Sequence, residues 1–272
     1  MPRASSMYGV DFIDGVGGAV LTTFVNVNNT IAGAGRIGDH GLILKNGGTI
    51  NATGSLEPGE NRDSLVIDTG SRTVTNTGTM EATGGDLYIA SPLSNTGVLI
   101  ADGFSLVAAQ ASTGGTAKLD DSGQIEFGGP TTTAVRFDDG SLTSLVLDDS
   151  VHFKGIISNF GKFNTAQTID LLDINAGHIV SYAAGVLTIK DNQNHTAQLH
   201  FSGAYSLSSF HLNADGHGGS VLTDPPAASA ATAALFGSHI AAAFPAGSSG
   251  FNGFAARYDT FTPPLLAPTP HG

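Results

Sequence analysis

The chain has 272 residues, of which 37 are glycine, and only 12% are charged. Glycine is about twice as frequent as usual and charged residues about half as frequent, so an ordinary helical enzyme is not expected. A net charge of −12 repels phosphate backbones and anionic lipid head groups, which disfavours nucleic acids and membrane surfaces as partners. The lack of cysteine in the sequence excludes disulfide scaffolds, thiolate zinc sites and thiol nucleophiles.

Residues 1–29 are interpreted as a lead-in to the rest of the chain. Arg3 is followed by Asp11 and Asp14 before the first apolar run, Val16 to Val20, so no N-terminal signal peptide is recognised. No stretch approaches the roughly 18 apolar residues that cross a bilayer. We therefore expect no membrane insertion.

Residues 30–141 contain a recurring pattern: Asn, any, Gly, any, apolar, any, Ala, any, Gly. The pattern begins at Asn46, Asn76 and Asn95, and a degenerate copy begins at Asp121. Each copy combines a turn of Asn and Gly, which accept a left-handed backbone, with a short strand of alternating apolar and polar residues. One such unit cannot bury its own apolar face, so the pattern predicts coils stacked about 4.8 Å apart.

The predicted fold is all-β: a right-handed β-solenoid with a C-terminal β-hairpin cap and a disordered tail. In this stack the asparagines form a hydrogen-bonded ladder, accompanied by the glycines two residues later. The ladder residues are Asn46, Asn76, Asn95, Gly48, Gly78 and Gly97. The alternative is a Gly-rich meander or sandwich in which Asn-x-Gly is simply a common hairpin turn.

Residues 142–224 are interpreted as a closing β unit. Their apolar residues are larger, and the turns Asp191–Asn194 and Asp215–Gly219 indicate hairpins. A unit of different sequence is the expected way to close the exposed strand edges of a stack. Residues 225–272 are rich in Ala, Ser, Pro and Gly; a short helix is expected over Ala227 to Phe244, and the rest of this tail is expected to be disordered.

The repeats, together with Phe153–Phe160, Thr168–Ile174 and Asp215–Val221, resemble the Gly-rich repeat modules of large secreted bacterial proteins, common in alphaproteobacteria. The resemblance covers residues 30 to 224 and extends to adhesins and autotransporter passengers. The segment from Phe153 to Ile174 is similar to the end-capping region of calcium-binding RTX proteins. The resemblance as a whole implies a secreted β-solenoid that acts at the cell surface.

One departure from that resemblance concerns calcium. The chain has no copy of the repeated calcium-binding nonapeptide of RTX proteins. The turn Asp215–Gly219 offers one carboxylate where calcium needs six to eight oxygen ligands. Ca²⁺ therefore stays an open possibility, and no cofactor is assigned.

Gly33, Gly35 and Gly38 match the dinucleotide fingerprint G-x-G-x-x-G, in which the last glycine opens a helix. Here it is followed by Leu42-Ile-Leu44, which is a strand pattern, so a turn is predicted instead. His195 and His200 are an odd number of residues apart and face opposite sides of a strand, which disfavours a zinc site.

Acidic residues are the remaining candidates for chemistry. Asp138, Asp139, Asp148 and Asp149, with Arg136 and His152 near them, invite comparison with β-helix lyases, epimerases and glycoside hydrolases, as does the pair Asp120-Asp121. Adjacent aspartates point to opposite faces of a strand, and at strand ends they are usually solvated turn residues, which is the interpretation we favour. No catalytic, cofactor-binding or metal-binding residue is assigned.

The sequence thus leaves three functional hypotheses. The first is an extracellular structural and adhesive module without catalysis, whose partners are glycans or cell-surface polymers and whose coils can associate end to end. The second is a carbohydrate-active β-helix enzyme. The third is a calcium-stabilised secretion module.

Overall fold

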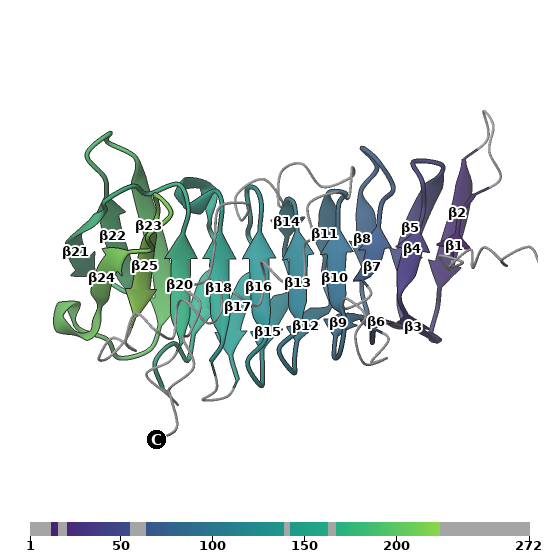
Figure 1. The fold of residues 1–272 in the computed structure, drawn as a ribbon, viewed down its shortest axis with the longest axis horizontal. Helices are drawn as coiled ribbons and strands as arrows, with labels where there is room; N and C mark the ends of the chain where they lie inside the picture. Colours follow the sequence, from purple (N-terminus) through teal and green to yellow (C-terminus); the bar gives the residue numbers. More distant parts are fainter. Residues whose placement is uncertain (1–11, 16–20, 55–63, 139–141, 163–166, 224–272) are drawn as a thin grey trace, which may run out of the picture. The chain divides into compact units, whose positions relative to one another are not determined.

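The computed structural model describes residues 12–15, 21–54, 64–138, 142–162 and 167–223. These residues form three β-sheets that run side by side (Figure 1). Helix is limited in the described residues to two short 3-10 turns, η1 (Ser150–His152) and η2 (Leu207–Ser209). None of the helices described is long and apolar enough to cross a membrane. The predicted helix over Ala227 to Phe244, with the rest of the tail, lies outside the described residues.

Each sheet takes its strands from successive passes of the chain. Sheet A has, in spatial order, β1 (Phe12–Ile13), β4 (Gly35–Ile37), β7 (Ser64–Ile67), β10 (Asp86–Ile89), β13 (Leu106–Ala109), β16 (Gln124–Phe127), β18 (Ser144–Leu147), β20 (Thr168–Leu171), β25 (Ser220–Thr223) and β24 (His211–Ala214). Sheet B has β2 (Thr22–Asn26), β5 (Leu42–Asn46), β8 (Val74–Asn76), β11 (Leu93–Asn95) and β14 (Ser112–Thr113). Sheet C has β3 (Thr30–Gly33), β6 (Thr49–Ala52), β9 (Thr79–Ala82), β12 (Val98–Ala101), β15 (Thr116–Leu119), β17 (Ala134–Phe137), β19 (Ile156–Ser158), β23 (Thr196–Ser202), β22 (Val186–Lys190) and β21 (His178–Ala183).

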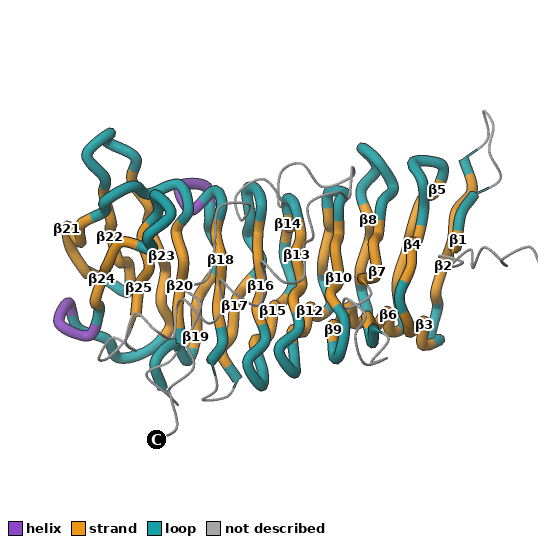
Figure 2. Tube along the Cα trace, in the orientation of Figure 1, coloured by secondary structure: helices purple, strands orange, loops and turns teal. Residues whose placement is uncertain are grey.

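The chain visits sheets A, B and C in turn, so three strands make one coil and about seven coils stack. Neighbouring coils pair in parallel; β6, β9, β12 and β15, for example, lie in exact register. The predicted β-solenoid is therefore confirmed. Figure 2 shows the turns of successive coils, in teal, next to one another along the long axis, at the ends of the orange strands.

The core lies between the three sheets. Side chains along each strand point alternately toward the core and away from it, and those that point inward are almost completely buried. Ile50, Met80, Leu99 and Ala117 are such inward residues in sheet C. Small residues share the neighbouring inward positions, with Ala52, Ala82 and Ala101 in register. Burying a large aliphatic side chain contributes about 1.5–3 kcal/mol, so the recurring apolar positions stabilise each coil on its neighbours.

The degenerate copy at Asp121 belongs to a different sheet from the other three. Its strand, β16, pairs with β13 in sheet A, whereas the strands after Asn46, Asn76 and Asn95 lie in sheet C. The strand that continues sheet C is β15, which follows Gly114 and Gly115. Assigning the copy at Asp121 to the same series was wrong, because an alternating strand after a Gly turn occurs at more than one corner of each coil.

The parallel stack extends beyond both ends of the predicted repeat region. At the start, β1 and β2 already pair with β4 and β5. Beyond residue 142, β18 and β20 continue sheet A in parallel, and antiparallel pairing begins only with the hairpin β21–β22 and with β25 against β20. Larger apolar residues after 142 therefore mark the last coils as well as the cap, because alternation looks the same in parallel and antiparallel strands.

Candidate functional site

The predicted asparagine ladder runs through the interior of sheet B. Asn46, Asn76 and Asn95 occupy equivalent positions of β5, β8 and β11. The Nδ2 atom of Asn46 donates to Oδ1 of Asn76 over 2.8 Å, and Nδ2 of Asn76 donates to Oδ1 of Asn95 over 2.8 Å. All three side chains are buried, so each amide replaces water as the hydrogen-bond partner of the next.

The ladder also connects sheet B to sheet C. Asn46 Nδ2 lies 3.1 Å from the Gly48 carbonyl oxygen and 3.0 Å from that of Thr79 in the next coil. The series ends at Asn95, whose Nδ2 has no hydrogen-bond partner among the described residues. A side chain on Gly115 would overlap the Asn95 amide, so glycine is required where the ladder stops.

Sequence reasoning missed the first member of the ladder, Asn26. Its Nδ2 donates to Oδ1 of Asn46 over 2.8 Å, and its Oδ1 accepts the backbone N–H of Asn29 at 3.0 Å. One more residue lies between Asn26 and the start of β3 than between Asn46 and the start of β6, so Asn26 does not fit the spacing of the sequence pattern. The following Thr30-Ile31-Ala32 could have revealed it, because it pairs in register with Thr49-Ile50-Asn51.

The glycines predicted beside the ladder allow the coils to approach closely. A Cβ atom on Gly48 would overlap the carbonyl oxygen of Asn29, one on Gly78 that of Gly48, and one on Gly97 that of Gly78. Close backbone approach, rather than a left-handed conformation, is therefore what these three positions require.

A row of hydroxyl groups lies on the exterior of sheet B. Thr75, Ser94 and Thr113 are in register on β8, β11 and β14, and Thr132 follows in the next coil through the bridge of Ser112 to Thr131. Thr113 and Thr132 are exposed, and Thr75 and Ser94 are half-buried. A second set on the exterior of sheet C consists of Thr49, Thr79 and Thr116, with Val98 between the last two.

Sheet A has a different exterior. All four residues of β10, β13, β16 and β18 are buried, including the outward Tyr88 and Val146.

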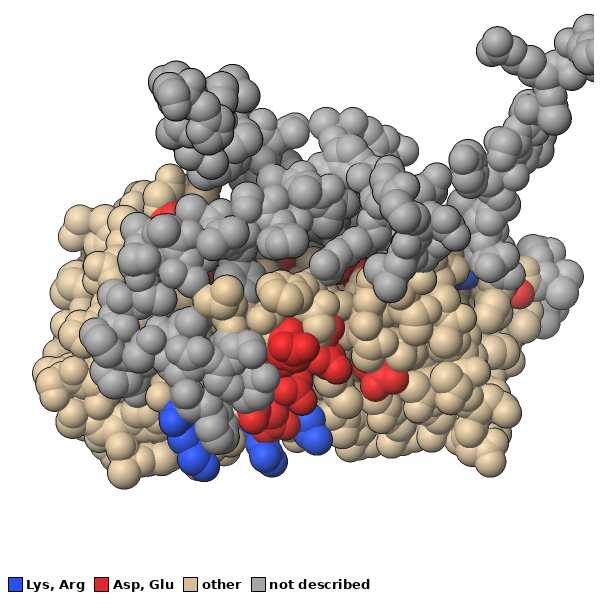
Figure 3. All heavy atoms as spheres, turned by 60° about the horizontal axis from the view of Figure 1, so that its bottom comes forward, with Lys and Arg blue, Asp and Glu red and all other residues tan. Residues whose placement is uncertain are grey.

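Three aspartates stack at the turn that follows sheet C. The backbone N–H groups of Asp102, Asp120 and Asp138 donate to the carbonyl oxygens of Ala82, Ala101 and Leu119 in the preceding coils, over 3.0, 2.9 and 2.8 Å. Basic residues lie beside them: Lys118 and Arg136 are in register, and Arg136 forms an ion pair with Asp138. Figure 3 shows one face on which acidic and basic side chains gather side by side.

This stacking affects one further carboxyl group. Glu81 lies on the exterior of β9, and its pKa is raised by burial and, to a smaller extent, by the charge of Asp102. The turn that holds Asp102 therefore makes ionisation of Glu81 less favourable.

The structure does not bring the predicted acidic residues together. Asp138 follows β17 in sheet C, whereas Asp148 and Asp149 follow β18 in sheet A, so β18 lies between them. Asp139 lies outside the described residues. Asp149 Oδ1 is 2.7 Å from His152 Nδ1, which is a local contact at the start of η1.

Asp170 is a functional candidate that the sequence did not single out. It faces outward from β20, beside Val146 of β18 and Val221 of β25. Burial raises its pKa to about 7, with smaller contributions from the carboxylates of Asp215 and Asp148. Asp215 is itself committed to its turn, since its Oδ1 accepts the N–H groups of His217 at 2.6 Å and Gly219 at 2.9 Å.

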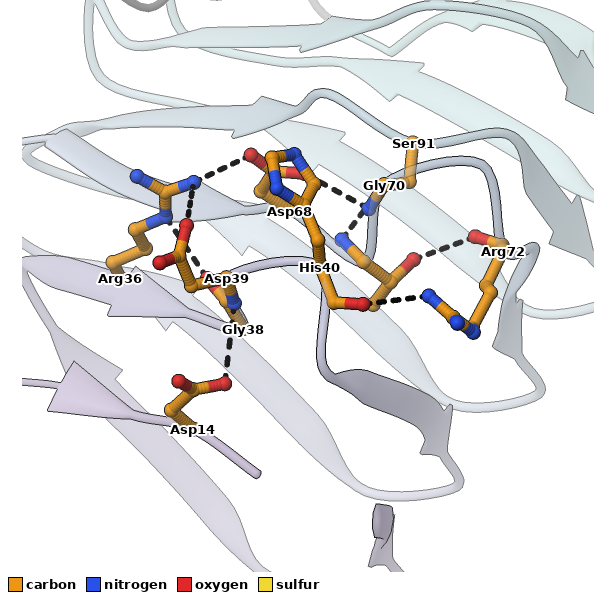
Figure 4. Close-up of polar contacts among 10 residues, drawn as sticks. Asp14, Arg36, Gly38, Asp39, His40, Asp68, Gly70, Arg72 and Ser91 are labelled. Carbon is orange, nitrogen blue, oxygen red and sulfur yellow. Dashed lines mark hydrogen bonds and ion pairs between the residues drawn. The ribbon is translucent and has the colours of Figure 1, made fainter. Parts of the chain in front are cut away.

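Among the described residues, a group of ion pairs lies at the corner between sheets A and B in the first coils (Figure 4). Asp68 Oδ2 lies 2.5 Å from Nη2 of Arg36, and Asp68 Oδ1 lies 3.3 Å from Nε2 of His40. The same Nη2 atom of Arg36 also lies 3.0 Å from Oδ1 of Asp39. Arg72 donates to the His40 carbonyl oxygen over 2.6 Å. These contacts join residues of successive coils, so the cluster stabilises the corner.

The glycine fingerprint belongs to this same corner. Gly38 has a φ of 85°, and a Cβ atom there would approach the Asp68 carbonyl oxygen to 2.5 Å. The strand β5 follows it, so the predicted turn is confirmed and no helix opens at Gly38.

The histidines are dispersed. His195 Nδ1 pairs with Asp191 Oδ2 at 2.8 Å in the turn before β23, whereas His200 lies on the exposed side of β23. Within the described ranges, no three His, Asp or Glu side chains are grouped so as to hold a metal ion.

Comparison with known proteins does not assign this chain to a family. No family model matches the sequence, and no curated protein is significantly similar to it.

Proposed function

We propose that this chain is an extracellular structural and adhesive module of a secreted bacterial surface protein, which makes weak multivalent contacts with glycans or other surface polymers. The observation that carries the proposal is the hydroxyl row of sheet B, in which Thr75, Ser94, Thr113 and Thr132 follow one another coil by coil.

The spacing of this row suits a repetitive partner. Adjacent strands lie about 4.8 Å apart, so the hydroxyls form a regular series of weak donors and acceptors. One such contact contributes little, but contacts linked along a polymer add to a much higher avidity. Glycans present hydroxyl groups in a comparable repeating manner.

The proposal includes no catalytic step, cofactor or metal. An enzyme of the β-helix type needs carboxylates that converge on a groove. The positions of Asp138 before β18, and of Asp148 and Asp149 after it, do not favour that alternative. Placement outside the cell rests on the resemblance of the repeats to modules of secreted proteins.

Retention on immobilised polysaccharides tests the proposal. The full chain should bind at least one long polysaccharide and should fail to bind its short oligosaccharides. The variant with Thr75→Val, Ser94→Ala, Thr113→Val and Thr132→Val should lose at least about tenfold in apparent affinity, because the linked contacts are removed. It also loses the hydrogen bonds of Thr113 Oγ1 to the Leu93 carbonyl oxygen and of the Gly114 N–H to Thr132 Oγ1, so its melting temperature is measured beside its binding. Thr188→Val, in the cap strand β22, is the matched control and should bind as the wild type does.

Two results would contradict the proposal. One is that no polysaccharide retains the chain. The other is retention that the four substitutions leave unchanged while the chain stays folded. Cleavage of a polysaccharide during the same assay would favour the enzymatic alternative.

A further inference from the structure

The two ends of the coil stack differ in how they are closed. At the C-terminal end, an aromatic cluster covers the last coil. The ring centroid of Phe201 lies 4.9 Å from that of Phe210 and 5.8 Å from that of Phe160, and the ring centroid of Tyr182 lies 5.2 Å from that of Phe210. Antiparallel hairpins then end sheets A and C. The strands β24 and β21 are the outermost of sheets A and C at this end, and the aromatic cluster fills the core beneath them.

At the other end, β1, β2 and β3 each form the edge of their sheet. In β2, the Thr22 N–H donates to Gly41 and the Asn26 carbonyl accepts from Gly47, so both residues direct their backbone groups toward the second coil. Successive residues of a parallel strand direct these groups to opposite sides. The N–H and C=O groups of Thr23 and Val25 therefore point away from the stack.

The same holds for β3. The carbonyl oxygens of Asn29 and Gly33 accept the N–H groups of Thr49 at 2.9 Å and Thr53 at 3.3 Å. Thr30 and Ala32 thus direct their backbone groups outward. No described strand pairs with this edge of β2 or β3, and an open strand edge is a template for pairing with another chain.

Apolar side chains surround this open edge. The core residues Ile13, Phe24 and Ile31 of the first coil are only partly buried. Leu21, Val25 and Val27 are 43%, 52% and 69% exposed. Inward residues at equivalent positions of later coils, such as Leu44 and Ile50, are fully buried by the coil that precedes them.

The surface at this end continues an interface that the molecule uses throughout. Each later coil presents the same edge, and each is covered by the coil before it through parallel pairing. Only the first coil lacks such a covering strand among the described residues. Its backbone groups and half-buried core are those that a further β-strand would satisfy.

We propose that β1, β2 and β3 form an interface between two copies of this chain, joined at their N-terminal ends. A two-fold axis relates the copies, so β2 pairs antiparallel with β2 of the second copy and the partly buried side chains of Phe24 meet across the axis. The same surface is used on both copies, so this two-fold pairing is complete at a dimer. This interface is independent of the proposed glycan contacts.

Sedimentation of the full chain over a range of concentrations tests the proposal. The wild type should show twice the monomer mass. Val25→Pro removes an edge N–H group that no described strand uses, and should yield a monomer with a nearly unchanged melting temperature. Val25→Thr keeps the N–H group and the strand, and should remain dimeric. A wild type that stays monomeric at every concentration would overturn the proposal, as would species that grow beyond a dimer.

Cross-linking provides a second test that does not depend on the proline variant. Because the chain has no cysteine, one introduced cysteine is unique. Thr23→Cys, exposed on β2, should give a covalent dimer with a short bis-maleimide, whereas Asn213→Cys, exposed on β24 at the C-terminal end, should not. Equal cross-linking at both positions, or cross-linking through Asn213→Cys alone, would contradict joining at the N-terminal ends.

Discussion

At the scale of single residues, Asp170 shows how the cap sets a local electrostatic cost. It stands between a parallel neighbour, β18, and an antiparallel one, β25. Burial and the carboxylates of Asp215 and Asp148 raise its pKa from 3.8 to about 7. The folded chain therefore holds a proton on Asp170 over a range of pH in which the unfolded chain has released it.

The pH dependence of stability follows from this difference. Between about pH 4 and pH 7 the folded state binds more protons than the unfolded state, so the contribution of Asp170 to the free energy of unfolding falls as pH rises. Asp170→Asn removes this titration. We expect the variant to exceed the wild type in stability by about 1–4 kcal/mol at pH 8 and by little at pH 4, measured by urea unfolding. A difference that does not vary with pH would contradict the pKa shift.

At the scale of elements, the asparagine ladder fastens β2, β5, β8 and β11 to one another. Asn76 sits in its middle, donating to Asn95 and accepting from Asn46. Buried amides that lose their partners cost more than the hydrogen bonds contributed, since water cannot replace them. The ladder therefore holds the coils in register as well as together.

Removing one rung should destabilise the stack. Asn76→Ala leaves groups of Asn46 and Asn95 without their ladder partner, so we expect the free energy of unfolding to fall by about 2–4 kcal/mol. Asn28→Ala, at an exposed position near the start of the ladder, is the matched control and should change it by less than about 0.5 kcal/mol. Chemical denaturation measures both. Equal effects of the two substitutions would show that the ladder does not stabilise the stack.

The elements also show what could be predicted of the candidate site. The spacing of Asn46, Asn76 and Asn95 pointed to their stacking, because identical side chains in register can bond to one another. Asn26 was not predicted because a single inserted residue changes the distance in sequence from the asparagine to the next strand, although β3 still pairs in register with β6. The hydroxyl row and Asp170 were not predicted, because the positions of these side chains relative to their neighbours depend on which strands lie next to each other.

At the scale of the whole coil stack, each coil contacts mainly the coils before and after it. Stability in such a stack is close to a sum of coil terms and neighbour terms. A coil is thus a unit that can be removed, provided that the strands which become neighbours keep their register. Leu87, Leu93 and Leu99 pair with Val107, Ser112 and Ala117, which defines the unit from Asp86 to Ser105.

Deleting residues 86–105 should therefore leave a folded chain. Gly85 would precede Leu106, and β13, β14 and β15 would stack directly on β7, β8 and β9. We expect a β-rich circular dichroism spectrum, a cooperative transition and a lower melting temperature. Deleting residues 86–95 removes half a coil, places strands on the wrong sheets and should prevent folding. If both deletions are equally unfolded, the coils are not separable units.

The sequence by itself determined that the chain is an all-β stack of short coils, because a repeated turn followed by an alternating strand leaves an apolar face that only another coil can bury. It also determined which side chains of β6, β9 and β12 face inward. Only the tertiary structure decided to which sheet each strand belongs, where parallel stacking ends, and that β18 lies between Asp138 and Asp148. The physical reason is that alternation sets the side a residue faces, whereas the neighbour of a strand is set by hydrogen bonds to residues a whole coil away, through turns of variable length.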